Sequence, residues 1–373
     1  MGDSILDVPP LAYARHHHDD GDQNANYPRE ADLAIYPLVF IFPIKSYKVV
    51  DCCNYHPHGN CGQSTFFESR RLCENLSAYK LGFSHPIESE ALFLYPIVAV
   101  HFSSRTPMPP LDTCVERVWL LSDAPAHSKE RIAPSGTIDL VINLHENELR
   151  IYDAAKPERC KRFSGAVVSG THSGPFVIDP RERVSVIGVR FRPGGAFPFL
   201  GTPASELADT HVDLEALWGI SAIELRERLC VAKTPAERFN LLEKALVAHL
   251  FRPLERHYAV RFALDTFCRA DSGLAIRDVA RDAGLSQRRF IQLFAREVGM
   301  SPKLFCRVRR FRQALETVRQ TAVPNWAQVA VDCDYYDQSH LIHDFRLFSN
   351  LSPTEYVRQR SECVMQNHAT LVG

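Results

Sequence analysis

Alternating apolar and polar residues predict short strands over the segment 108–215. The stretch TIDLVINLHENELRIYD predicts two strands on either side of a turn at Glu146 and Asn147. The stretch RVSVIGVRFRPGGAF predicts a strand that ends at a Pro-Gly-Gly turn, and GAVVSGTHSGPFVID predicts further strand. Short strands separated by glycine and proline turns are typical of a small barrel or sandwich, so we expect a β-rich domain here.

A helical spacing replaces this alternation over the segment 216–270. The stretches SAIELRERL, TPAERFNLLEKALVAHLF and AVRFALDTFCRA place apolar residues three and four positions apart, as an amphipathic helix does. Thr234, Pro235 and Glu237 form a typical helix start, with the threonine as N-cap and the proline at the first helical position. We therefore expect a helical connector in this segment.

The segment 1–107 shows no sustained periodicity of either kind. It contains a group of cysteines and histidines whose spacing matches no usual set of zinc ligands. These residues are Cys52, Cys53, His56, His58 and Cys61. We therefore interpret this segment as poorly patterned sequence rather than as a metal site.

Met108 stands where the patterned sequence begins. Methionines occur only at positions 1, 108, 300 and 365, so Met108 is the methionine nearest to the start of the patterned region. We therefore expect residues 1–107 to reflect a mis-assigned gene start, and a genuine extension of the protein is the alternative. Native peptides from residues 30–100, detected by mass spectrometry in the source cell, would contradict the first interpretation.

Two later stretches about fifty residues apart resemble each other. ARDAGLSQRRFIQLFAREVGMSP begins at Ala280, and AVDCDYYDQSHLIHDFRLFSNLSP begins at Ala330. With one extra residue in the second stretch, Phe290 corresponds to Leu341. The chain therefore contains an internal repeat.

Each copy of the repeat has the layout of a helix-turn-helix motif. A short amphipathic helix is expected over 276–283 in the first copy and over 326–333 in the second. A tight turn follows, and a polar capping residue, Ser286 or Asp337, starts a second helix. We expect this second helix to enter the major groove of DNA, where base edges offer hydrogen-bond donors and acceptors.

The outward residues of these second helices are the candidates for contacting DNA. The base-reading candidates are Gln287, Arg288, Ile291 and Gln292 in the first copy and Gln338, Ser339 and His343 in the second. The phosphate-contacting candidates are Arg289, Arg296, Lys303, Arg307, Arg309 and Arg346. The segment 285–312 holds eight basic residues and one acid in a chain of net charge −1, and a solvated helix face is the alternative for this charge.

A third helix is expected between the two copies, over SPKLFCRVRRFRQALETVRQ. Phe305, Val308, Phe311 and Leu315 give it one apolar face. Such a helix can join two helix-turn-helix units rigidly. Two recognition helices held about 34 Å apart would reach successive major grooves on one face of the duplex.

Several histidines lie beside other polar residues and raise the question of a metal site. His340 and His343, near Asp337 and Asp344, fall on the second recognition helix, so we interpret them as DNA-facing or structural residues. The candidates in the β-rich segment are His145, His172 and His211. They could coordinate a metal at a barrel mouth, or they could be isolated histidines with ordinary hydrogen bonds.

Arg190 and Arg192 alternate along one predicted strand. Residues two apart in a strand share a face, so these arginines could meet an anionic ligand together. Arginines held in salt bridges at the rim of the domain are the alternative.

The segment 271–360 resembles the DNA-binding domain of the AraC/XylS family of transcriptional regulators. The resemblance is carried by AIRDVARDAGLSQRRFIQLFAREVGMSPKLFCRVRRFRQAL and DYYDQSHLIHDFRLFSNLSPTEYV. Asp334 stands where the family usually has glycine, and aspartate tolerates a left-handed turn less well. Weaker resemblance upstream, over PPLDTCVERVWLL, ERIAPSGTIDLVINL, VSGTHSGPF and VIGVRFRPGGAFPFLG, is to a small domain that precedes this DNA-binding domain in some members.

The resemblance implies an α+β multidomain protein, with a β-rich sensor-like domain before an all-α domain that holds two helix-turn-helix units and a tail at 361–373. It implies a sequence-specific transcription regulator under small-molecule control. By analogy, the partners are double-stranded DNA, RNA polymerase, an effector and a second copy of the chain. A DNA-binding regulator with no ligand is the first alternative, and an enzyme with a β-rich catalytic domain is the second.

The remaining features of the sequence weigh against other classes. The eleven cysteines lack paired spacing, and neither a secretory signal nor an apolar run of membrane-spanning length is present. We therefore expect a cytoplasmic, nucleoid-associated protein. No nucleophile elbow, phosphate loop or zinc-helix motif occurs, so we expect neither catalysis nor a cofactor or metal.

Overall fold

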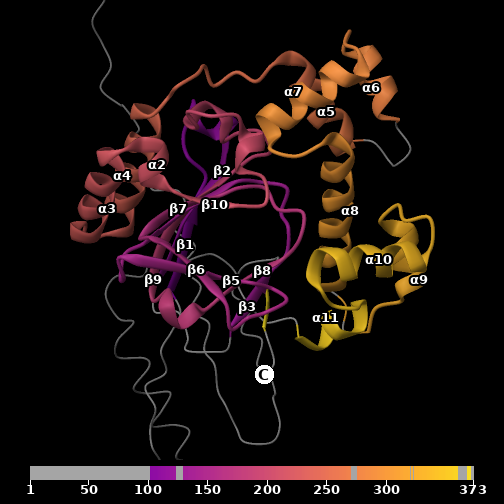
Figure 1. Cartoon of the computed structure of the whole chain (residues 1–373), viewed down its shortest axis with the longest axis horizontal. Coiled ribbons are helices and arrows are strands. Elements are labelled where there is room, and N and C mark those ends of the chain that lie inside the picture. The colour runs from indigo at the N-terminus through magenta and orange to yellow at the C-terminus, as the bar shows by residue number, and fades with distance from the viewer. Residues whose placement is uncertain are drawn as a thin grey trace, which may run out of the picture. The chain divides into compact units, whose positions relative to one another are not determined.

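The computed structural model describes most of the chain after residue 100. The described residues are 101–122, 129–269, 275–319, 321, 323–359 and 368–370. The cysteine and histidine group between residues 52 and 61 lies outside them, as does most of the tail. A β-rich part precedes a helical part (Figure 1). This order confirms the α+β fold class expected from the sequence.

Two sheets form the β-rich part, and all neighbouring strands in them run antiparallel. The order in the first sheet is β1 (His101–Arg105), β2 (Val115–Ser122), β9 (Ser185–Phe191), β4 (Asp139–Asn143), β7 (Ala166–Ser169) and β10 (His211–Asp213). The order in the second sheet is β11 (His368–Thr370), β3 (Glu130–Ile132), β8 (Phe176–Ile178), β5 (Glu148–Tyr152) and β6 (Cys160–Ser164).

Strand β4 shows how the alternation in the sequence places the two layers. Leu140 and Ile142 join the largest buried cluster, which also contains residues of the helices that follow the strands. Val141, on the opposite face of the same strand, joins a second cluster with Leu149 of β5. The first sheet is therefore covered by helices on one face and by the second sheet on the other.

Three helices follow the strands and cover the outer face of the first sheet. They are α2 (Leu214–Trp218), α3 (Ile220–Val231) and α4 (Pro235–Ala248). Helix α4 starts as the sequence predicts, because Thr234 accepts from the Glu237 amide and the Glu237 side chain accepts from the Thr234 amide. Short 3₁₀ helices lie between strands: η1 (Leu111–Thr113), η2 (Pro180–Glu182), η3 (Phe197–Phe199) and η4 (Ala204–Leu207).

The helical part consists of two small bundles that share one long helix (Figure 1). Its elements are α5 (Tyr258–Arg269), α6 (Ile276–Asp282), α7 (Gln287–Val298), α8 (Pro302–Arg319), α9 (Trp326–Asp332), α10 (Gln338–Ser349) and α11 (Pro353–Gln359). Phe305, near the start of α8, packs with α5, α6 and α7. Phe311, further along, packs with α9, α10 and α11. Helix α8 is thus the expected connection between the two units.

The structure extends the β-rich domain beyond the segment 108–215 at its N-terminal side. Strand β1 pairs with β2 from His101 opposite Ser122 to Arg105 opposite Val118. This five-residue edge strand is only partly buried, which explains why its sequence, HFSSR, shows no clear alternation. A chain that began at Met108 would lack this strand.

The expected connector at 216–270 divides between the two parts. Helices α2, α3 and α4 share the core of the first sheet, whereas α5 belongs to the core of the first helical bundle. At the other end of the chain, β11 adds an edge to the second sheet. No helix in the described ranges is long and apolar enough to cross a membrane.

Candidate nucleic-acid interface

The first helix-turn-helix unit is formed by α6 and α7. Gly284 takes a left-handed conformation in the turn, with a φ of +68°. The Ser286 hydroxyl accepts a hydrogen bond from the Arg289 amide at 3.3 Å and caps the start of α7. Gly299, with a φ of +94°, ends the helix.

The second unit, formed by α9 and α10, repeats this local chemistry with different residues. Asp334 occupies the turn with a φ of +60°, so it takes the left-handed conformation expected of a glycine there. Asp337 accepts from the His340 amide at 2.7 Å and caps α10. Asn350, with a φ of +55°, ends the helix in place of glycine. The internal repeat of the sequence is thus a repeat of two helix-turn-helix units.

Most of the predicted base-reading residues lie on the exposed faces of α7 and α10. Gln287, Arg288, Gln292, Gln338, Ser339 and His343 are exposed, and Ile291 is half-buried. The opposite faces carry buried aromatic residues, Phe290 and Phe294 on α7 and Phe345 and Phe348 on α10. Each recognition helix therefore presents a polar face that its own bundle does not use.

The basic residues of this region divide into two groups. Arg289, Arg296, Lys303 and Arg346 are exposed, as a phosphate contact requires. Arg307, in contrast, pairs with Asp344 of α10 at 2.6 Å. Arg309 donates to the carbonyls of Phe267 and Cys268 at the end of α5. The last two arginines therefore join helices together, and a phosphate contact by either of them stays a prediction.

The paired histidines of α10 do not converge on a metal site. The ring of His340 packs edge to face on Tyr335, with 5.2 Å between the ring centroids. His343 is exposed, and its Nδ1 atom lies 3.6 Å from Asp344. No group of three or more histidine, cysteine, aspartate or glutamate residues in the described part of the chain is arranged to hold a metal ion.

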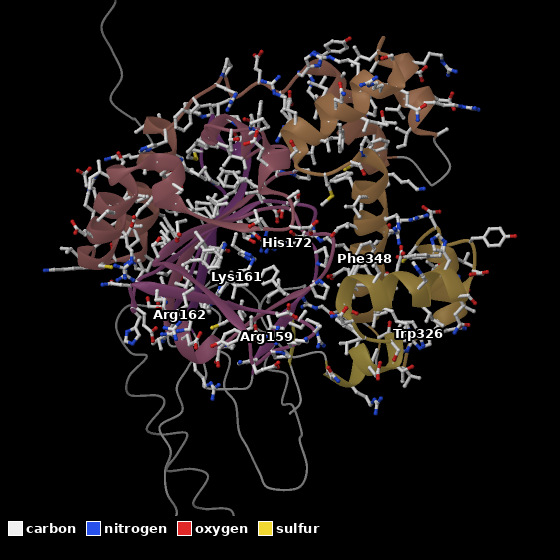
Figure 2. The ribbon with its side chains drawn as sticks, viewed as in Figure 1. Arg159, Lys161, Arg162, His172, Trp326 and Phe348 are labelled. Atoms are coloured by element: carbon white, nitrogen blue, oxygen red, sulfur yellow. The ribbon has the colours of Figure 1, made fainter. Side chains whose placement is uncertain are left out.

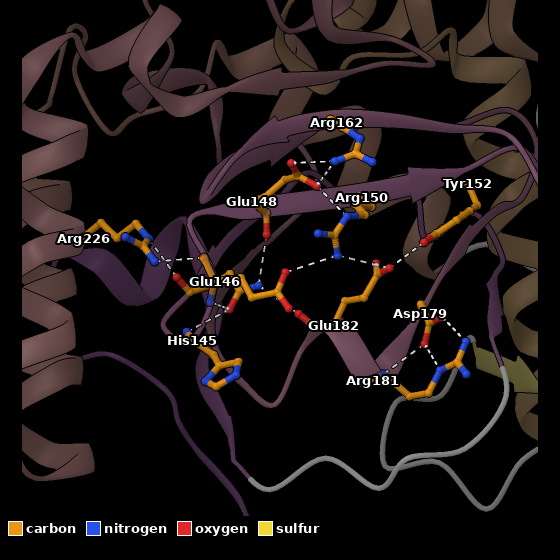
Figure 3. A network of polar contacts seen from close by, with 11 residues as sticks. His145, Glu146, Glu148, Arg150, Tyr152, Arg162, Asp179, Arg181, Glu182 and Arg226 are labelled. Carbon is orange, nitrogen blue, oxygen red and sulfur yellow. Dashed lines mark hydrogen bonds and ion pairs between the residues drawn. The ribbon is translucent and has the colours of Figure 1, made fainter.

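His145 lies beside a polar network at one end of the β-rich domain (Figure 3). Its amide donates to the side chain of Asn143, which is fully buried, and Arg226 of α3 donates to the Asn143 carbonyl. Arg150 of β5 lies among three glutamates, at 3.2 Å from Glu146, 2.5 Å from Glu148 and 3.2 Å from Glu182. The charged groups pair with one another, and Arg226 joins the turn between β4 and β5 to α3. We therefore interpret the network as structural.

His172 and His211 come together, although they are far apart in the sequence. Their ring centroids are 4.7 Å apart. The Ser169 hydroxyl lies 3.1 Å from the Nε2 atom of His172 and 3.2 Å from that of His211. Burial lowers the pKa of His172 to about 4 and places the pKa of His211 well below its usual value. Both rings are therefore neutral at pH 7.

The two arginines of β9 have separate partners. Arg190 is buried and forms two hydrogen bonds with Asp139, at 3.0 and 3.2 Å. Arg192 donates to the Asp112 carbonyl at 2.9 Å. The salt-bridged alternative therefore describes Arg190, and the two residues do not form a joint anion site.

Comparisons with known proteins agree with this geometry. A family model described as a helix-turn-helix domain matches residues 279–359. A second family model, a domain of unknown function (DUF6597), matches residues 103–213. No curated protein sequence matches the chain.

The C-terminal domain is an AraC-type helix-turn-helix domain. The expected resemblance is therefore confirmed for the part of the chain that holds the two recognition helices. The match of the second family model begins at residue 103, within β1.

Solved structures of ToxT from Vibrio cholerae resemble the chain distantly. An apo variant of ToxT aligns with a TM-score of 0.38 and 11% identity, over 69% of this chain and 97% of ToxT. ToxT bound to an unsaturated fatty acid aligns with a TM-score of 0.35 and 10% identity, over 64% of this chain and 94% of ToxT. At this level of similarity, the ligand of ToxT is a property of ToxT alone.

Asp344 in the AraC-type domain was not singled out as a site residue from the sequence. In the internal repeat it stands where the first copy has Leu293, on the apolar face of the recognition helix. Asp344 is fully buried, so its charge needs the partner that Arg307 supplies. The sequence did contain a signal for this residue, because an acid stands where the other copy of the repeat has an apolar residue.

Two loops of the β-rich domain contact the AraC-type domain. The Thr171 hydroxyl donates to the carbonyl of Gly299, at the end of α7, across 2.8 Å. Arg312 of α8 donates to the Ser135 carbonyl at 3.1 Å, and Ala133 belongs to the same buried cluster as Val308 of α8. Both the first recognition helix and the connecting helix therefore have partners in the β-rich domain.

Proposed function

We propose that this protein is a sequence-specific DNA-binding transcription regulator that reads DNA with α7 and α10. The observation that carries the proposal is the pair of equivalent exposed faces on these two helices. Gln287 corresponds to Gln338 in the repeat, and Gln292 corresponds to His343. Such side chains can donate to and accept from base edges in the major groove.

The two units are proposed to act on one face of the duplex. Helix α8 runs through both bundles and joins them, so it can hold the two recognition helices at a defined spacing. Two recognition helices separated by about one helical turn of DNA, about 34 Å, can occupy successive major grooves. The DNA site would then contain two short elements about ten base pairs apart.

The exposed basic residues are proposed to supply the affinity that does not depend on sequence. Arg289 and Arg296 lie on α7, Lys303 on α8 and Arg346 on α10, and all four are exposed. Arginine and lysine contacts with phosphates release counterions, so binding that uses them weakens as the salt concentration rises. The four residues would position the recognition helices rather than distinguish bases.

Control by a small molecule is proposed to act through the β-rich domain. The support is structural: Thr171 contacts the end of α7, and Arg312 of α8 contacts the Ser135 carbonyl. A change of the β-rich domain at either loop would alter contacts of the DNA-reading unit. RNA polymerase, a second copy of the chain and a location at the cytoplasmic nucleoid are further elements of this proposal.

Selection from a random pool of duplex DNA by the full chain tests the proposal. The selection is carried out at about 150 mM salt, where binding through phosphates alone is suppressed. We expect an enriched motif with two elements about ten base pairs apart. The matched variants are Arg288→Ala, which should lose the preference within one element, and Ser339→Ala, which should lose it within the other.

Two outcomes would contradict the proposal. A failure to enrich any motif, by a protein that is folded and binds DNA weakly at low salt, would contradict sequence-specific reading. An enriched motif that neither Arg288→Ala nor Ser339→Ala changes would show that α7 and α10 are not the reading elements.

A further inference from the structure

A row of polar side chains crosses the first sheet of the β-rich domain. Arg190 of β9 lies opposite Asp139 of β4, Asp139 lies opposite Ser169 of β7, and Ser169 lies opposite His211 of β10. Residues directly opposite one another in antiparallel strands project from the same face of the sheet. The four side chains therefore form one continuous row.

This row lies on the face that is covered by the second sheet. Val141 and Val167, two residues along β4 and β7 from Asp139 and Ser169, share that face and pack with Leu149 of the second sheet. The interior between the sheets is otherwise apolar at these positions. A polar row inside it needs either complete internal pairing or another partner.

Aromatic rings surround the end of the row that carries His211. We call Phe163, Ser169, His172, Phe176 and His211 the histidine cluster. The centroid of the His211 ring lies 4.7 Å from that of Phe176 and 5.8 Å from that of Phe163. His172, from the loop after β7, lies 4.9 Å from Phe176. Two strands of the second sheet and two segments of the first thus meet here.

The histidine cluster lies at an edge of the domain that solvent reaches. Strands β6 and β10 are each the last strand of their sheet, and they contact each other. The rings of Phe163, Phe176, His172 and His211 are half-buried rather than buried. These four residues therefore retain some exposed area that a small molecule could cover.

Positively charged side chains lie near the histidine cluster. Lys161 shares a face of β6 with Phe163, and both Lys161 and Arg183 lower the pKa of His211 by their charge. At His172, burial lowers the pKa, and the charges of Asp209 and Asp139 oppose that lowering. Both already have donors of their own: Ser173 donates to Asp209 at 2.6 Å, and Arg190 pairs with Asp139.

Trp119 adds an unused donor on the same face of the first sheet. It lies opposite Gly188 of β9, two residues along that strand from Arg190, and therefore in the row next to the polar one. Its side chain is only 7% exposed, and its indole N–H has no hydrogen-bond partner among the described residues. This interior thus holds a buried donor, the Trp119 N–H, that lacks an acceptor among the described residues.

We propose that the histidine cluster binds a small carboxylate that also carries an apolar group. The carboxylate would accept hydrogen bonds from Ser169, His172 and His211, and the apolar group would lie against Phe163 and Phe176. The inference rests on the proposed control of the protein by a small molecule and names the class of that effector. A sugar or polyol fits less well, because its hydroxyl donors would find the nearby acids already occupied.

Binding would be transmitted by the loop that carries His172. Thr171, the preceding residue, holds the end of α7 through its bond with Gly299. The same loop is tied to η4 at Asp209, whose amide donates to the Thr171 carbonyl at 2.8 Å. A ligand that moves His172 would therefore act on a segment in direct contact with the first recognition helix.

Calorimetric titration of the full chain with two acid and amide pairs tests the proposal. The probes are benzoate with benzamide and hexanoate with hexanamide, each pair differing in charge but hardly in shape. We expect saturable binding of at least one carboxylate and binding weaker by about ten-fold or more for its amide. Because an anion raises the pKa of a neighbouring histidine and the pKa of His172 starts from about 4, carboxylate binding should take up protons near pH 5.5, seen as heats that depend on the buffer.

Substitutions of the histidines locate the site. His172→Gln and His211→Gln should each weaken carboxylate binding and reduce the proton uptake. His145→Gln is the matched control, since His145 is exposed and belongs to the separate network of Figure 3. Unfolding curves of every variant establish that the protein remains folded, and a variant that unfolds is replaced by Ser169→Ala.

Three results would overturn the proposal. They are a failure of both carboxylates to bind, equal binding of acid and amide, and binding unchanged by the histidine variants. None of these measurements uses DNA, and the DNA selection uses none of the carboxylate or amide probes. The two proposals are therefore tested independently. A protein that selects a DNA motif but binds neither carboxylate would retain the proposed reading function and lose only this inference.

Discussion

The hydroxyl of Thr171 donates a hydrogen bond to the carbonyl of Gly299 across 2.8 Å, and both residues are buried. Thr171 belongs to the β-rich domain, whereas Gly299 ends the first recognition helix. A side chain at position 299 would crowd this contact, since a Cβ there would lie 2.8 Å from the Thr171 hydroxyl. The two domains thus meet at a point with no spare volume.

Replacement of Thr171 by valine removes this hydrogen bond while keeping the shape of the side chain. We expect the free energy of unfolding to fall by about 1–3 kcal/mol, because the Gly299 carbonyl would remain buried without this donor. Urea unfolding of the full chain measures the change. Thr113→Val is the control, since the Thr113 hydroxyl donates to the Pro110 carbonyl at the same 2.8 Å but at an exposed site. Equal losses in the free energy of unfolding for the two variants would show that burial does not increase the contribution of the hydrogen bond to Gly299.

The ion pair of Arg307 and Asp344 makes a prediction that separates structure from DNA binding. Arg307→Ala would leave the fully buried Asp344 carboxylate without its partner, which should destabilise the domain by about 3 kcal/mol. A double variant, Arg307→Met with Asp344→Leu, restores the apolar residue that Leu293 provides in the first copy, and we expect it to recover most of that loss. Urea unfolding measures both variants.

A direct phosphate contact by Arg307 would give a different pattern. The double variant would then be stable but would bind all DNA sequences more weakly and with a smaller salt dependence. Arg289→Ala serves as the control, because Arg289 is exposed on α7 and Arg289→Ala should leave stability almost unchanged.

The lowered pKa of His172 predicts a dependence of stability on pH. The folded protein holds this ring neutral down to about pH 4, whereas the unfolded chain protonates it near pH 6.5. The unfolded state therefore binds more protons between these values, and stability must fall as the pH decreases through this window. The charged groups around the ring are Asp209 and Asp139, and His211 lies against it.

His172→Gln should flatten this profile. The difference in the free energy of unfolding between pH 7 and pH 4.5 should shrink by on the order of 2 kcal/mol relative to the unchanged protein. Urea unfolding at a series of pH values measures it. His145→Gln should leave the profile as it was, and an equal effect of the two variants would contradict the assignment to His172.

Arg288 and Arg289 are adjacent on α7 but should behave differently toward DNA. Arg288→Ala is expected to weaken binding to the selected site by about 1–3 kcal/mol and to relax the preference at one position. Arg289→Ala should weaken binding to all sequences alike and reduce the slope of log K against log salt by about 1. Binding isotherms on matched and scrambled duplexes at several salt concentrations compare the two, and a reversed pattern would exchange their roles.

The sequence predicts the helical domain well because its signals are local. The cap residues Ser286 and Asp337 and the apolar positions at helical spacing lie within a few residues of the elements that they define. The exposed faces of α7 and α10 follow directly from that spacing. The double helix-turn-helix and most of its candidate DNA contacts could therefore be derived before the structure.

The pairings between distant segments could not be derived in this way. Periodicity indicates which face of an element is buried, but it does not name the residue that packs against it. The partner of Arg307 lies 37 positions away, and His172 and His211 belong to different strands and loops. Strand β1 gave no signal because an edge strand need not alternate.

Helix α8 joins two reading helices that are similar but not the same. Arg288 in one corresponds to Ser339 in the other, and Gln292 corresponds to His343. If α7 and α10 read DNA as proposed, a single molecule would lie on it with a head and a tail, and the sequence that it prefers would not be a palindrome. Inverting such a site beside a promoter would turn the bound protein around and present a different domain to whatever is bound next to it.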